Sequence, residues 1–60
     1  MWIKTKGGYL LNMDCVDFVH FMDGNTYAFT GNTRHLITDE DILNRITYNL
    51  ARGTTVMEVQ

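Results

Sequence analysis

Three residues that could bind a metal ion or transfer a proton lie at three-residue steps: Asp14, Asp17 and His20. On a helix this spacing would place two carboxylates and an imidazole on one face, where they could ligate a metal ion. The segment from Val16 to Met22 is instead rich in valine and phenylalanine, which favour strands. On a strand the three side chains alternate between faces, so we expect no metal site and no other cofactor.

The remaining reactive groups also lack the neighbours that catalysis needs. Cys15 is the only cysteine, no base or cation stands next to it, and the chain has no serine. A calcium-binding loop starting at Asp23 would need glycine and a carboxylate at its sixth and twelfth positions, which here are Ala28 and Arg34. We therefore expect a protein that is not an enzyme and has no small-molecule substrate.

Binding to another macromolecule is the chemistry that remains, and a polar helix side is the first candidate surface. Arg45, Tyr48 and Arg52 follow one another at spacings of three and four residues, so they share one side of a predicted helix. Tyrosine and arginine are enriched at protein–protein hot spots. We expect these three residues to bind a larger protein.

A second candidate surface mixes aromatic and basic residues near the start of the chain. Trp2, Lys4 and Lys6 share a predicted strand face, and Tyr9 lies across a hairpin turn. Such a surface could stack nucleobases, as small nucleic-acid-binding barrels do. The net charge of −2 gives no electrostatic footprint for phosphate binding, so a core or interface role for Trp2 with solvated lysines is favoured.

The helix that carries the first surface is predicted from Thr38 to Gly53. Thr38 can cap its start with Asp41 three residues later, Arg52 complements the negative end of the helix dipole, and Gly53 can end it. The apolar residues form one stripe of about 100° that we expect to be buried: Ile42, Leu43, Ile46 and Leu50.

Turn residues divide the rest of the chain into short strands. We predict strands at residues 1–5, 9–13, 16–22 and 26–30, a short fifth at 34–37, and a last one at 54–59. Residues 1–60 are therefore expected to form a single small α+β domain. Its architecture is an antiparallel β-meander of four to five short strands covered by one C-terminal helix, then a short last strand.

The predicted third strand is apolar on both faces, with Phe18 on one side and Phe21 on the other. One helix can cover only one face of a sheet, so the other needs a second sheet layer, a curled barrel wall or another copy of the chain. A core built from 60 residues barely offsets chain entropy. We therefore expect a homodimer with Trp2, Phe18 and Phe21 in its interface; the rival is a strongly bent sheet that wraps its own helix.

Three further features predict where in the cell the protein is found. No apolar run approaches the roughly 18 residues needed to span a membrane, no signal-peptide pattern opens the chain, and a single cysteine fits a reducing compartment. We expect a cytoplasmic protein without a membrane partner.

The first thirteen residues contain Ile-Lys-Thr-Lys, a glycine turn and a Leu-x-Asn strand. In this the chain resembles a group of short bacterial and phage proteins of unknown function that open with Ile-Lys-Thr-Lys-x-Gly-x-Leu-x-Asn and continue with strands, a capped helix and a short last strand. This chain has a shorter middle, because Gly31 and Asn32 end the fourth strand early. The resemblance implies a fold and a phage or mobile-element setting, and no activity.

These observations leave two classes of function. The first is a non-enzymatic regulatory protein that docks on a larger protein, of which an inhibitor of a host defence system such as CRISPR–Cas is one concrete form. The alternative is a small nucleic-acid-binding barrel that uses Trp2, Tyr9, Lys4 and Lys6. A gel shift at low salt separates the two, because phosphate binding depends steeply on salt.

Overall fold

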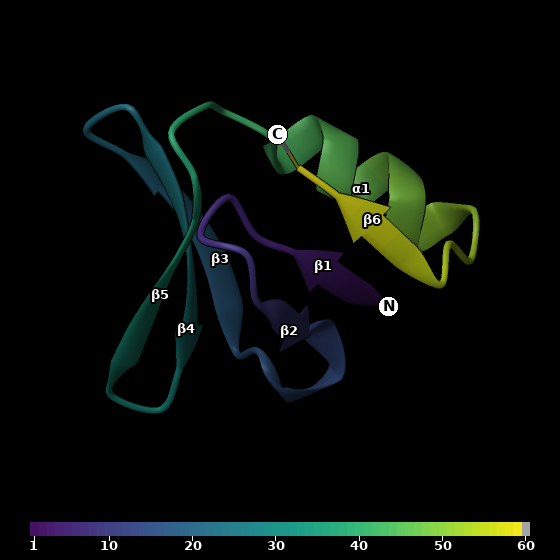
Figure 1. Cartoon of the computed structure of the whole chain (residues 1–60), viewed down its shortest axis with the longest axis horizontal. Helices are drawn as coiled ribbons and strands as arrows, with labels where there is room; N and C mark the ends of the chain where they lie inside the picture. The colour runs from purple at the N-terminus through teal and green to yellow at the C-terminus, as the bar shows by residue number, and fades with distance from the viewer. Residues whose placement is uncertain (60) are drawn as a thin grey trace.

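The first and last strands of the fold lie side by side in one sheet. In the computed structural model, which describes residues 1–59, β1 (Trp2–Lys4) lies between β2 (Leu10–Asn12) and β6 (Val56–Glu58). β2 pairs with β1 antiparallel, whereas β6 pairs with β1 parallel. All the other elements lie in the connection between β1 and β6 (Figure 1). We call these three strands the first sheet.

The second sheet is an antiparallel meander of β3 (Phe18–Met22), β4 (Asn25–Thr30) and β5 (Thr33–Thr38), joined to the first by η1 (Met13–Cys15). Asp23 and Gly24 form the β3–β4 turn with φ of 52° and 82°, the positive values that a tight two-residue hairpin requires. Between Leu36 and Thr38 the register shifts, leaving Ile37 as an extra residue.

The helix α1 runs from Leu43 to Ala51, so the predicted start at Thr38 is wrong. Thr38 is the last residue of β5, lies opposite Thr26, and is buried. Pairing with β4 therefore overrides the local capping signal. The turn before the helix is held instead by Asp41, whose carboxylate accepts the Leu43 N–H at 3.2 Å. The predicted stop is confirmed, since Gly53 follows the helix with φ of 74°.

A hydroxyl from the second sheet also fixes the start of the helix. The fully buried Thr26 hydroxyl accepts the N–H of Ile42, the N-cap residue, at 3.3 Å. It donates to the Glu40 carbonyl at 2.5 Å. Ile42 has no side-chain cap of its own, so a strand side chain takes over part of the capping role.

One hydrophobic core joins both sheets and the helix: Ile3, Leu11, Ala28, Ile37, Ile42, Ile46, Met57 and Val59. Of the predicted helix stripe, Ile42 and Ile46 are buried and Leu43 is half-buried. Leu50 is 52% exposed, so its predicted burial is wrong. The helix begins later and is shorter than predicted, and only its first turns reach the core.

The predicted α+β class is confirmed, with a meander, one helix near the C-terminal end and a short last strand. The inner face of β3 is covered, with Val19 packed against the core, while Phe18 on the other face remains 55% exposed. The total exposed surface of 3913 Å² is close to the roughly 4000 Å² expected for a folded monomer of this mass. No helix within residues 1–59 is long and apolar enough to cross a membrane.

Candidate protein-binding surfaces

The polar side of α1 presents an aromatic ring with a cation stacked on it. Tyr48 is 59% exposed, and the Arg52 guanidinium lies over its ring, 5.2 Å from the centroid. The Arg52 Nη1 also donates to the Tyr48 hydroxyl at 3.4 Å. The two residues are one helical turn apart, as their spacing of four predicts.

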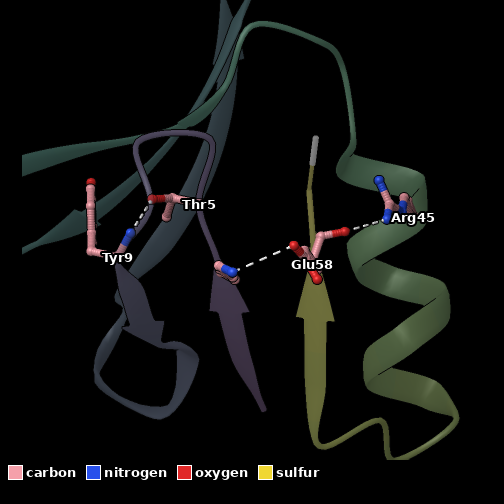
Figure 2. A network of polar contacts seen from close by, with 5 residues as sticks. Thr5, Tyr9, Arg45 and Glu58 are labelled. Atoms are coloured by element: carbon pink, nitrogen blue, oxygen red, sulfur yellow. Dashed lines mark hydrogen bonds and ion pairs between the residues drawn. The ribbon is translucent and has the colours of Figure 1, made fainter.

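Arg45, the third residue expected at this surface, has a different contact. Its Nη2 donates to the backbone carbonyl of Glu58 at 2.7 Å, which ties α1 to β6 (Figure 2). Arg45 is exposed, but its guanidinium is directed to the last strand. Tyr48 and Arg52 therefore form the surface pair, and Arg45 holds the helix that carries them.

The outer face of the first sheet carries Trp2 and Lys4, as the strand alternation predicted. Trp2 lies in register with Val56, and Lys4 lies in register with Leu10 and Glu58. Lys4 Nζ is 3.6 Å from the Glu58 carboxylate, and this ion pair joins β1 to β6 (dashed line to Glu58 in Figure 2). The Lys4 cation on this face is thus paired with a carboxylate.

The turn between β1 and β2 fastens the first sheet to β5 rather than presenting free charge. Lys6 Nζ lies 2.6 Å from the Asp39 carboxylate, and this hydrogen bond and positive charge lower the pKa of Asp39. The Lys6 N–H donates to the Ile37 carbonyl at 2.8 Å, and the Tyr9 hydroxyl donates to the Leu36 carbonyl at 3.2 Å. Both lysines of the expected nucleic-acid surface are therefore engaged with carboxylates.

The outer face of the second sheet holds a contiguous group of side chains that we call the aromatic face: Phe18, His20, Tyr27, Phe29, Arg34 and Leu36. Strand register places them in two rows across β3, β4 and β5. The rings of Phe18 and Phe29 stack at 4.5 Å and 12°. The Arg34 guanidinium lies over the Tyr27 ring, 4.5 Å from its centroid.

Of this face, the sequence analysis placed only Phe18 in the expected dimer interface. The alternation of side chains along the fourth and fifth strands could have identified the other residues of this face, because it puts Tyr27 and Phe29 on one side. The pairing of β3 with β4 then sets Phe29 directly beside Phe18. Arg34 already lies in the predicted fifth strand, and the register of β4 with β5 places it beside Phe29 in the same row.

The three residues expected in a dimer interface lie on three different surfaces. Trp2 is on the outer face of the first sheet, and Phe18 is on the aromatic face. Phe21 points to the opposite side of β3, in register with the buried Thr26, and is half-buried. No single interface can therefore use all three residues.

The arginines and lysines of residues 1–59 differ in their partners. Each of the two lysines has a carboxylate partner, and none of the three arginines does. Arg34 and Arg52 lie instead on tyrosine rings, and Arg45 contacts a backbone carbonyl. A guanidinium stacked on a ring keeps its planar fork of N–H donors available to a partner.

The residues first considered for chemistry are not brought together. Asp17 accepts the Gly31 N–H at 2.8 Å, and Asp14 lies in η1, while His20 is on the aromatic face. Over residues 1–59 no three His, Cys, Asp or Glu side chains cluster as a metal site, and no pocket forms.

Comparison with known proteins gives no relative: no family model, curated protein or solved structure matches this chain.

Proposed function

We propose that this chain is a non-enzymatic binding protein that docks on a larger protein through Tyr48 and Arg52. The observation that carries the proposal is the exposed Tyr48 ring with the Arg52 guanidinium over it. Tyrosine and arginine are the residue types that dominate the energy of protein interfaces when a partner desolvates them. The free donors of Arg52 fit a carboxylate on the partner.

The support beneath this pair favours binding as well. Ile42 and Ile46 anchor α1 in the core, and Arg45 ties it to Glu58 on β6. Arg52 already packs on the Tyr48 ring, and a side chain that keeps its free-state contact loses less rotamer entropy when a partner binds. In the phage or mobile-element setting that the resemblance implies, one concrete form of this function is a regulator or inhibitor of a host protein such as a CRISPR–Cas component.

Affinity capture from host lysate with quantitative mass spectrometry tests the proposal. Tyr48→Ala and Arg52→Ala should each lower recovery of the partner about tenfold or more, since a hot-spot truncation weakens binding by about 2 kcal/mol. Leu50→Ala is the matched control, because Leu50 is similarly exposed but projects from another side of the same helix. Equal recovery by the wild type and both test variants would exclude this surface.

Nucleic-acid binding, the alternative function, is tested by a separate experiment. Trp2 and Tyr9 are exposed, but Lys4 and Lys6 are paired with carboxylates. A gel shift with single-stranded oligonucleotide at low salt should show no complex. A complex that Trp2→Ala and Tyr9→Ala remove, and that salt dissociates, would support nucleic-acid binding in place of the docking function.

A further inference from the structure

We propose that a second copy of this chain covers the aromatic face, with a two-fold axis that lies in the interface plane and runs along β4. This contact does not involve α1, because the helix packs on the core side of the second sheet. It is therefore independent of the docking function proposed above, and a dimer would present two copies of the Tyr48–Arg52 pair.

The aromatic face is mainly apolar and carries a single arginine. Phe18 is 55% exposed although it stacks on Phe29, and Leu36 is 42% exposed in the adjoining row. The single arginine, Arg34, has no carboxylate partner within residues 1–59. Covering such a face removes apolar area from water, which is favourable by about 25 cal/mol per Å² before the costs of association.

Symmetry gives this face a complementary partner in its own copy. A two-fold axis along β4 lays β3 of one copy over β5 of the other, since these strands flank β4 on its two sides. Phe29 then faces Phe29 of the partner subunit, and Tyr27 faces Tyr27 of the partner subunit. In each copy Phe18 faces Arg34 of the partner subunit, so both guanidinium groups of the dimer meet an aromatic ring.

This axis also keeps the like charges apart. The two Arg34 side chains lie at opposite edges of the interface, about 10 Å apart because two strand spacings separate β3 from β5. An axis across the strands would instead leave both arginines at the same edge. Two sheets that pack face to face keep their strands within about 30° of each other, which the axis along β4 satisfies.

Side chains of the aromatic face already pack on one another in one copy. Arg34 rests on Tyr27, and Phe18 rests on Phe29, so little rotamer freedom is lost on assembly. A standard interface takes about 800 Å² from each partner, roughly a fifth of the 3913 Å² that this chain exposes. A three-stranded face is small by this measure, so we expect a dimer with a dissociation constant on the order of micromolar.

Sedimentation analysis over about 1 to 1000 µM protein tests the arrangement. The wild type should convert from monomer to dimer across this range. Phe18→Lys should remain monomeric, because the new lysine faces an arginine, whereas Phe18→Glu should dimerise with a salt-sensitive affinity. The double variant Phe18→Lys/Arg34→Glu should restore the dimer, because its opposite charges then face each other.

Trp2→Lys is the matched control, since it places the same charge on an exposed aromatic position of the other sheet. It should dimerise like the wild type, and circular dichroism should show that all variants remain folded. A wild type that stays monomeric at the highest concentration overturns the proposal. So do equal effects of Phe18→Lys and Phe18→Glu, or a single-stranded oligonucleotide that binds the wild type through Phe18 and Arg34.

Discussion

The outer faces of the two sheets are built from similar residues and differ in how their charges are arranged. The first sheet shows Trp2, Leu10 and Val56 around an ion pair between Lys4 and Glu58. The second sheet shows stacked phenylalanines and a cation on a tyrosine ring, and this cation has no ion-pair partner among residues 1–59. A cation that is already paired within its own face is less available for an ion pair or cation–π contact with a partner than an unpaired one.

The helix repeats the second arrangement at a separate place. Arg52 lies on Tyr48 as Arg34 lies on Tyr27, and neither arginine has a carboxylate partner among residues 1–59. The lysines instead pair with carboxylates of the same chain, with Lys6 joining the β1–β2 turn to Asp39. Within residues 1–59 the lysines contact carboxylates of the same chain, whereas two of the three arginines lie on tyrosine rings, at the surfaces for which we propose partners.

The contrast between the faces assumes that both sheets belong to one folding unit, and the largest predicted effect tests this. Ile3→Ala removes a fully buried side chain from the inner face of the first sheet and should destabilise the fold by about 2 to 5 kcal/mol. Trp2 is the only tryptophan and reports on the first sheet, while far-ultraviolet circular dichroism reports on the whole. Both signals should change together in urea, at a lower midpoint than in the wild type.

Leu10→Ala serves as the control for Ile3→Ala, since Leu10 is exposed on the outer face of the same sheet. Its effect should stay within about 0.5 kcal/mol. A tryptophan transition that precedes the circular dichroism transition would show that the first sheet unfolds separately, and the comparison of two faces of one unit would then fail.

Two buried threonines that face each other give the next prediction. Thr26 bonds Glu40 and Ile42 at the helix start, whereas the Thr38 hydroxyl has no partner within residues 1–59. Thr26→Val should cost about 1 to 3 kcal/mol, because it leaves a buried N–H and a carbonyl unpaired. Thr38→Val should be neutral or stabilising. Denaturant midpoints measure both, and equal losses would mean that Thr26 does not hold the helix start.

The smallest predicted effect concerns the paired lysines. The pKa of Asp39 lies below its ordinary value of 3.8 because Lys6 donates a hydrogen bond and a positive charge to the carboxylate. The pair therefore stabilises the fold above pH 3.8, and this contribution is lost as the pH falls through the pKa of the folded state. Because the pair is exposed, the gain is small.

Titration of the Asp39 carboxyl by NMR checks this assignment. Lys6→Gln should raise the pKa of Asp39 toward its ordinary value, whereas Lys4→Gln should leave it unchanged, since Lys4 pairs with Glu58. If Lys6→Gln leaves the titration of Asp39 unaltered, the two lysines are not engaged as described, and the contrast with the arginines weakens.

Much of the fold could be predicted from local signals. The Asp23–Gly24 turn, the alternation in β1 and β3 and the glycine after the helix all lie where the residues indicated, because each depends on neighbours in the chain. The helix start could not be placed, because Thr38 serves equally as a cap or as a strand residue. Only the pairing with Thr26 decides between the two.

In the candidate surfaces, too, contacts between near neighbours in the chain could be predicted and contacts between distant segments could not. Tyr48 and Arg52 could be placed together because helical spacing is local. The contact of Arg45 with the Glu58 carbonyl could not be foreseen, since it joins the helix to a strand that follows later in the chain. The aromatic face needed the register of three strands before Arg34 and Phe18 could be placed on one surface.

We expect the parallel pairing of β1 with β6 to govern the order in which this chain folds. Trp2 pairs with Val56, 54 positions away, so the first sheet closes a long loop, whereas the β3–β4–β5 hairpins join close neighbours. Closing long loops slows folding, because their entropy is lost before the contacts form. We expect the meander to form early and β6 to add last. Until it does, β1 remains an open edge onto which another chain can pair, and slowing that final step would favour aggregation.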